Sequence, residues 1–163
     1  MQVAAAYTLV TFLLFLIHSF LVSYLTIIHV VPDILLIWIV YLAIRRGQLA
    51  GTVAGFAIGL LLDLSSGEAS MLGLAALTKS IGGFVAGYFF NENRMFQILG
   101  SYKFVVAVGV IALVHNTLYF LIFLQGTSIV MWDILLQYAL PASLYTALLA
   151  LLPMFIFARK HIS

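Results

Sequence analysis

The chain has 163 residues, of which 65% are hydrophobic and only 7% are charged. Because soluble domains carry about 25% charged residues, this composition excludes an ordinary soluble enzyme. The formal net charge of +2 is too small to indicate a nucleic-acid partner, and a chain without cysteine has no thiol nucleophile, disulfide or thiolate metal site.

Three uncharged stretches predict helices that cross a membrane. They cover residues 1–32, 104–132 and 134–158, and each is longer than the ~20 residues that a helix needs to cross the hydrocarbon of a bilayer. The first stretch lacks the basic start of a cleaved signal peptide and is too long for its apolar core. We therefore expect it to remain as a first span over residues 4–28.

The second span is expected over residues 32–46. Pro32 and Asp33 suit the first turn of a helix, and Arg45 and Arg46 end the segment because each central arginine costs ~2.5 to 3.5 kcal/mol on the insertion scale. At 1.5 Å per residue this span measures only about 22 Å. One long helix over residues 34–62 is the alternative, and the arginine pair argues against it.

Four further spans follow along the chain. We expect them at residues 47–63, 70–90, 103–124 and 133–157. After the fourth span, Met95, Phe96, Ile98 and Leu99 have the spacing of a short helix at the membrane interface. Six spans leave no room for a soluble domain, so the sequence predicts one transmembrane domain over residues 1–163, an all-α bundle of six helices.

The basic residues predict the orientation of this bundle. Six crossings place nearly all of them on one side of the membrane, namely Arg45, Arg46, Arg94, Lys103, Arg159 and Lys160. The connections on the other side carry no Lys or Arg, so the positive-inside rule makes the basic side cytoplasmic. We expect a multi-pass membrane protein with both termini in the cytoplasm.

Glycines at a spacing of four residues predict close helix packing. Gly47, Gly51, Gly55 and Gly59 share one face of the third span, and Gly83 and Gly87 repeat the spacing in the fourth. Small residues on one face let a neighbouring helix approach closely. The interpretation that we favour is packing within this bundle, and a docking groove for a partner's helix is the alternative.

A few polar residues fall inside the spans. Lys79 is the one basic residue away from the cytoplasmic side, and His18 and His115 lie near the middle of their helices. Such residues face protein or a cavity rather than lipid. We expect them to form hydrogen bonds between helices, with Asp63 as the partner of Lys79; a proton relay or ligand site in a transporter is the alternative.

Catalysis and metal binding find little support in the sequence. Two histidines on separate helices without a matching carboxylate are a weak metal signal, and the nucleophile motifs of hydrolases are missing. We expect no cofactor, no metal and no enzyme, although an acid–base site built from Asp63 and Lys79 remains an alternative.

Part of the chain resembles a known family. Residues 32–47 read P-D-I-L-L-I-W-I-V-Y-L-A-I-R-R-G, residues 50–67 read A-G-T-V-A-G-F-A-I-G-L-L-L-D-L-S-S-G, and residues 71–77 read M-L-G-L-A-A-L. This string resembles the rod shape-determining protein MreD family, with its Pro-Asp opening, Arg-Arg-Gly turn and Ser-Gly loop. The matching residues are Pro32, Asp33, Arg45, Arg46, Gly47, Gly51, Gly55, Gly59, Asp63, Ser66, Gly67 and Gly73.

The resemblance implies a role in bacterial cell shape. It implies a non-enzymatic subunit of the rod complex, or elongasome, in the bacterial cytoplasmic (inner) membrane. Its direct partner would be an MreC-like bitopic membrane protein; a RodA-type glycosyltransferase, a class B penicillin-binding transpeptidase and MreB filaments would be indirect partners, and membrane lipid would surround it.

The same resemblance supplies a rival function. The family's fold is similar to the S components of energy-coupling-factor transporters, so a small-molecule-binding transporter subunit is the alternative. The short connections on the outer side argue against a lidded vitamin site. An intramembrane enzyme is a second rival, and the sequence contains no convergent catalytic set for it.

Overall fold

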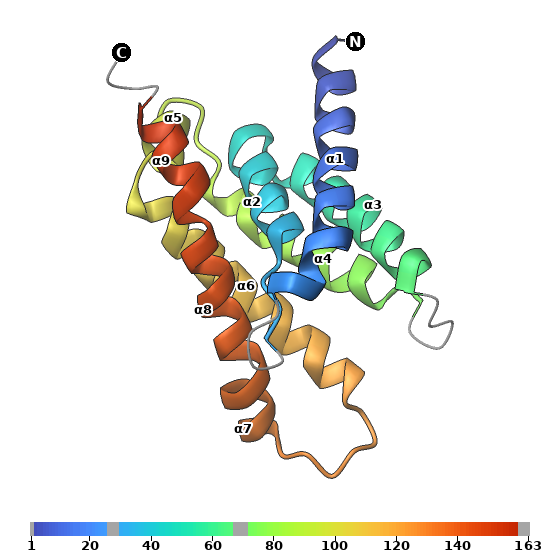
Figure 1. Cartoon of the computed structure of the whole chain (residues 1–163). Coiled ribbons are helices and arrows are strands. Elements are labelled where there is room, and N and C mark those ends of the chain that lie inside the picture. Colours follow the sequence, from blue (N-terminus) through green and yellow to red (C-terminus); the bar gives the residue numbers. More distant parts are fainter. Residues whose placement is uncertain (1, 26–29, 67–71, 160–163) are drawn as a thin grey trace.

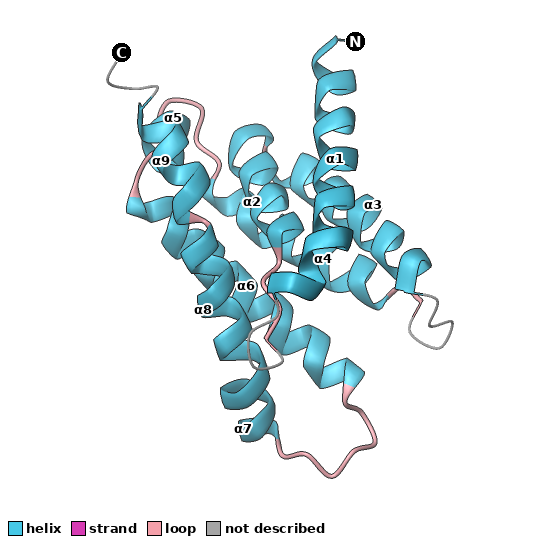
Figure 2. Cartoon of the chain, in the orientation of Figure 1, coloured by secondary structure: helices cyan, strands magenta, loops and turns pink. Residues whose placement is uncertain are grey.

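The computed structural model describes residues 2–25, 30–66 and 72–159 of the chain. Within these ranges the regular elements are helices, and none is a strand (Figure 2). Figure 1 shows that the start of α1 (Gln2–Leu25) and the end of α9 (Leu151–Arg159) lie at the same end of the molecule, the upper end in this view. The all-α architecture expected from the sequence is confirmed.

α1 contacts the rest of the molecule through one face only. Its large apolar side chains Leu9, Phe12 and Phe20 are exposed. Its polar contacts with the next helix include a hydrogen bond from the indole N–H of Trp38 to the Thr11 hydroxyl oxygen at 2.9 Å. A helix with this much exposed apolar surface requires lipid or another protein around it.

α2 (Ile34–Arg46) is the central helix of the molecule. It has 13 residues, about 20 Å at 1.5 Å per residue, and every side chain from Leu35 to Ile44 except Trp38 is buried. The helix begins two residues after Pro32 because Asp33 is its N-cap, whose Oδ1 accepts a hydrogen bond from the Leu36 N–H at 2.8 Å.

α2 ends at the arginine pair. The chain leaves it through Gly47, whose φ of 91° is a backbone conformation that side chains disfavour, and α3 (Gln48–Ser66) begins at the next residue. The single long helix over residues 34–62 is therefore wrong for this chain, as the cost of two central arginines predicted.

α3 and α4 (Leu74–Ala86) pack side by side as a hairpin, and one 3₁₀ turn, η2 (Gly87–Phe89), extends α4. The span expected at residues 70–90 thus begins, as a helix, at Leu74. Gly67 of the expected Ser-Gly loop lies outside the described residues.

The short helix expected after residue 94 is present as α5 (Met95–Leu99). Phe96 is exposed, whereas Leu99 is buried in the main core, so α5 anchors the start of α6 (Tyr102–Phe123) against the bundle. Residues 124–130 connect α6 to the next helical segment, and this is the longest connection wholly within the described residues.

The last helical segment runs from Met131 to Arg159, and its α-helical geometry is interrupted twice, by a π-helical turn and by a break at Ala150. It consists of α7 (Met131–Asp133), a π-helical turn η3 (Ile134–Ala139), α8 (Leu140–Leu149) and α9. Pro141 and Pro153 lack the backbone N–H that would bond the carbonyls of Gln137 and Leu149. The π-helical turn ends two residues before Pro141, and the break at Ala150 lies three residues before Pro153.

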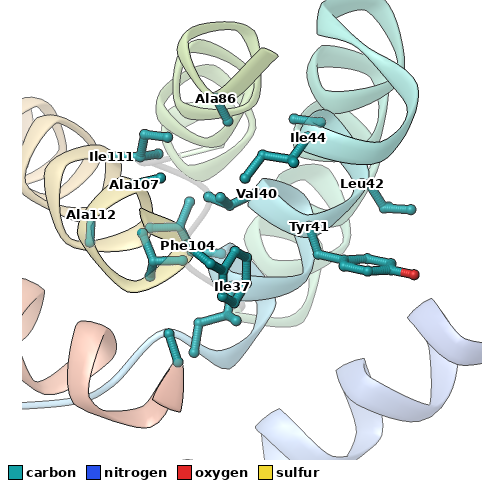
Figure 3. Close-up of a cluster of buried hydrophobic side chains, with 14 of the residues drawn as sticks. Ile37, Val40, Tyr41, Leu42, Ile44, Ala86, Phe104, Ala107, Ile111 and Ala112 are labelled. Carbon is teal, nitrogen blue, oxygen red and sulfur yellow. The ribbon is translucent and has the colours of Figure 1, made fainter. Parts of the chain in front are cut away.

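The main core forms around α2 (Figure 3). Ile37 and Val40 of α2 lie against Phe104, Ala107 and Ile111 of α6, and all five are buried. A smaller cluster of Leu35, Ile39 and Ile58 joins the opposite side of α2 to α3. The central helix therefore gains its stability from apolar contacts on all sides.

Three described segments are long and apolar enough to cross a membrane. They are Gln48–Ser66 with 19 residues, Tyr102–Phe123 with 22 and Met131–Arg159 with 29. Shorter apolar segments are Ala5–Phe20 and Leu74–Phe89. The chain is thus a helical membrane protein by length and composition, while the six-span bundle stays a prediction.

Candidate functional site

A buried ion pair joins α4 to the start of α2. The Lys79 ammonium bonds the Asp33 carboxylate Oδ2, and the side chains of Lys79 and Asp33 are 4% and 15% exposed. The sequence-based expectation that Lys79 pairs with Asp63 is wrong. Asp33 is the N-cap of α2, and this end of α2 lies beside α4, so the Asp33 carboxylate is within reach of the Lys79 ammonium.

Asp63 binds the N-terminus of α4 instead. Its carboxylate accepts hydrogen bonds from the backbone N–H groups of Gly73 at 3.1 Å, Ala75 at 3.0 Å and Ala76 at 3.0 Å. The first N–H groups of a helix have no partner within the helix, and they attract negative charge. Because α4 begins at Leu74 rather than at residue 70, its first backbone N–H groups lie beside the Asp63 carboxylate and bind it in place of Lys79.

His115 of α6 extends the ion pair into a three-helix cluster. Its Nε2 lies 3.6 Å from Asp33 Oδ2, and its Nδ1 is buried without a hydrogen-bond partner. His18 of α1 also has a buried Nδ1 without a partner. The structure therefore brings the sequence-predicted polar residues to one region, with Asp33 at its centre.

Residues that the sequence analysis did not select complete this polar region. The backbone N–H of Asp33 donates to the Thr146 hydroxyl at 3.0 Å, and the Asn116 amide donates to the Ser143 hydroxyl at 3.1 Å. Ser143 and Thr146 lie three residues apart on one face of α8, and Asn116 follows His115 directly. Polar side chains at one face of an apolar helix were the available signal.

A cavity of about 700 Å³ opens beside this polar region. Polar residues from five helical elements line it. They include His18, Asp63, Lys79, His115, Asn116 and Gln137. Its apolar side includes the aromatic rings of Tyr119, Phe120 and Tyr138. Among the described residues, no group of three or more metal-ligating side chains forms a metal site.

The glycine face of α3 lies directly against α4. A methyl group added at Gly51 would overlap the Gly83 carbonyl, one at Gly55 the Lys79 carbonyl, and one at Gly59 the Ala75 backbone. Gly87 is equally close to the backbone of Gln48. These contacts favour packing within the bundle over a partner's groove, because α4 already occupies this face.

Two further motif residues lie at the end of α3 and directly before α4. The Ser66 hydroxyl donates to the Asp63 carbonyl at 2.8 Å, and Gly73 has a φ of 95°, in the left-handed region that favours glycine. Gly67, which the motif also includes, lies outside the described residues. The motif therefore contains residues at the end of α3 and the start of α4, where the Asp63 carboxylate binds the N-terminus of α4.

The two arginines lie at the opposite end of α2 among aromatic rings. The Arg45 guanidinium bonds the Tyr41 hydroxyl, and the Arg46 guanidinium lies 5.2 Å from the centre of the Tyr7 ring. Trp38 and Tyr41 stack with ring centroids 5.0 Å apart. This end of α2 is therefore fixed to α1 by cation–π and aromatic contacts.

Comparison with known proteins adds one finding. The family model described as rod shape-determining protein MreD matches residues 2–161. The match extends well beyond residues 32–77, where the resemblance was most visible, into the second half of the chain. No curated protein and no solved structure gives a significant match.

Proposed function

The chain belongs to the family of the rod shape-determining protein MreD, and we propose that it acts as a scaffold subunit of the rod complex in the cytoplasmic membrane. The family is one of shape-determining membrane proteins, and the match over residues 2–161 is the observation that carries the proposal. In this role the chain holds other proteins of lateral cell-wall synthesis together and performs no catalysis itself.

The direct partner in this proposal is an MreC-like bitopic membrane protein. Through it the chain connects to a RodA-type glycosyltransferase, a class B penicillin-binding transpeptidase and MreB filaments. Two observations support recognition within the membrane. The connections described are short, and apolar side chains such as Leu9 and Phe20 of α1 and Leu152 and Phe155 of α9 are exposed.

The proposed topology has six crossings and cytoplasmic termini. The Arg46 guanidinium donates to the Tyr7 hydroxyl at 3.4 Å, which brings the first half of α1 to the arginine end of α2. A methyl group at Gly100 would lie 3.2 Å from the Ala158 backbone, so the start of α6 meets the end of α9. Arg45, Arg46, Lys103 and Arg159 therefore belong to segments that meet at one end, in line with the positive-inside rule.

Depletion of the chain in its rod-shaped host tests the proposal. We expect cells to round up or die. We also expect that the MreC-like protein no longer co-purifies with the remaining complex, because the scaffold that holds it is missing. Mass spectrometry of the complex purified through the tagged chain identifies the partners. Recovery of an ATPase pair and a coupling subunit in place of the MreC-like protein would contradict the scaffold and favour a transporter.

A further inference from the structure

A groove of about 800 Å³ lies where α1, α2 and α3 meet (Figure 1), and we call it the α1–α3 groove. The side chains of α3 that line it are all apolar, and Arg46 is the one charged residue among its described lining residues. These include Thr8 and Phe12 of α1, Arg46 of α2, and Ala50, Val53 and Leu61 of α3. Phe12, Val53 and Leu61 are exposed, so the groove opens on the surface of the bundle, where a membrane protein meets lipid.

The groove has the length of one leaflet of a bilayer. Along α3 its lining runs from Ala50 to Leu61, which measures about 16 Å at 1.5 Å per residue. One leaflet contributes about half of the ~30 Å of hydrocarbon. A helix ~10–12 Å across would occupy at least about 1,200 Å³ over the same length, so a partner's helix would overlie this groove of about 800 Å³ without entering it. An acyl chain is narrower than a helix and fits along the groove.

The end of the groove at Arg46 carries positive charge without a counter-charge. Arg46 is exposed, and its guanidinium donates to the Tyr7 hydroxyl at 3.4 Å and lies over the Tyr7 ring. The Arg45 guanidinium lies 6.0 Å from the centre of the same ring. Neither arginine forms an ion pair with a carboxylate of the described residues. A guanidinium has five N–H donors, so Arg46 retains donors for a further acceptor.

We propose that the α1–α3 groove binds one anionic phospholipid, with an acyl chain along the apolar wall of α3 and its phosphate on the Arg46 guanidinium. Guanidinium groups bind phosphate oxygens through charge-assisted hydrogen bonds. A negative headgroup offsets both arginines, whereas the ammonium group of a zwitterionic lipid is repelled by Arg45. The site goes beyond the scaffold function, because it requires only that the chain lies in a membrane.

Binding of matched lipids to the purified full chain in detergent tests the proposal. The probes are dioleoylphosphatidylglycerol, which is anionic, and dioleoylphosphatidylcholine, which has the same acyl chains and no net charge. Native mass spectrometry counts the molecules bound and measures their affinities. We expect one phosphatidylglycerol per chain, bound about tenfold more tightly than phosphatidylcholine, because only the anionic headgroup offsets both arginines. sn-Glycerol 3-phosphate, which carries the charge without acyl chains, should not compete with it.

Two substitutions show whether the bound lipid occupies this groove. Arg46→Gln removes the charge at its end and should abolish the preference for phosphatidylglycerol, while binding of phosphatidylcholine stays unchanged. Val53→Trp places a large ring in the groove and should weaken binding of both lipids about tenfold. Because Val53 is exposed, this variant keeps its packed core and keeps the test valid if Arg46→Gln loosens α1 from α2.

Matched controls change residues that do not line the groove. Arg94→Gln removes another exposed arginine of the basic end. Val106→Trp enlarges a side chain of α6 that is 57% exposed, against 59% for Val53. Both controls should leave the affinities and the lipid preference unchanged, and circular dichroism checks the fold of every variant.

A photoreactive benzoylphenylalanine in place of Val53 identifies the occupant of the groove in the native membrane. We expect a phospholipid adduct, and a cross-link to a second copy of the chain or to another protein would overturn the proposal. Equal affinities for the two lipids, competition by sn-glycerol 3-phosphate, or binding that neither groove substitution changes would also overturn it. These measurements do not involve cell shape or the MreC-like protein, so failure of the lipid site and failure of the scaffold function remain distinguishable.

Discussion

The pairing of Lys79 with Asp33 is the main correction at the scale of single residues. Asp33 lies at the N-terminus of α2, and Asp63 lies at the N-terminus of α4. Which of the two carboxylates pairs with Lys79 depends on what else each one binds. Asp63 is occupied by three backbone N–H groups, whereas Asp33 Oδ1 accepts one such bond and Oδ2 is left for Lys79. Backbone donors at a helix start are always present, so they outcompete a flexible side chain.

A double-mutant cycle measures this ion pair. Asp33→Asn retains an N-cap side chain but leaves Lys79 charged and buried, so we expect a loss of about 3–5 kcal/mol in the free energy of unfolding. Lys79→Gln added to Asp33→Asn should restore part of the loss, because no uncompensated charge remains. Reversible unfolding in mixed micelles measures the coupling.

Asp63→Asn with Lys79→Gln is the control cycle. Its effects should add, because the two side chains do not pair in the structure. Coupling in the control cycle together with additivity in the Asp33 cycle would contradict the assignment and restore the pairing expected from sequence.

At the scale of elements, the α3–α4 hairpin shows how the spacing of glycines becomes a contact between backbones. Gly51, Gly55 and Gly59 face α4 without side chains between the helices, so the axes approach closely and the two helices bury each other's backbone. Gly82 of α4 differs, because its nearest neighbours beyond its own helix are side-chain atoms of Ile111 and Leu36, both at 3.5 Å from an added methyl group.

Alanine substitutions at two buried glycines test this contact. At Gly55 the methyl group overlaps the Lys79 carbonyl, and backbone does not yield easily, so we expect Gly55→Ala to destabilise the chain by about 1–3 kcal/mol. Gly82→Ala is the matched control and should be neutral or stabilising, because alanine favours a helix over glycine by ~0.8–1.0 kcal/mol. Thermal unfolding in detergent compares them, and equal effects would mean that the hairpin is not closely packed.

At the scale of the whole molecule, the bundle is built from helices of unequal length. α6 has 22 residues and is long enough to span the membrane, whereas the 13 residues of α2 measure about 20 Å against ~30 Å of hydrocarbon. In the proposed topology, which places the arginines of α2 at the membrane surface, the other end of α2 lies below the opposite surface. Val30 and Val31, which precede this end of α2, line the cavity with polar walls.

Reporter fusions test the topology. Fusions after Arg46 and after Ser163 should report the cytoplasm, and a fusion at Ser128, between α6 and α7, should report the outside, because the basic residues hold their end in the cytoplasm. The Ser128 fusion is the internal control for the reporter. A cytoplasmic signal at Ser128, or an external signal at Arg46, would rule out the six-crossing arrangement.

The sequence alone determined the class of protein, the breaks between several helices and the family. These follow from local properties: an uncharged stretch of sufficient length favours the bilayer, a pair of arginines ends a helix, and glycines four residues apart share a face. The break at Arg45 and Arg46 and the close approach at Gly55 could be predicted without knowing which residues are their neighbours in the tertiary structure.

Only the tertiary structure decided which partner each polar residue has. Asp33 and Lys79 are 46 residues apart. Their ion pair depends on where the N-terminus of α2 lies beside α4 and on the backbone N–H groups that already bind Asp63. The cavity depends on five segments at once, so no pattern in one segment predicts it. Local sequence specifies the length and polarity of each helix, but relative depth and pairing arise from packing all helices around α2.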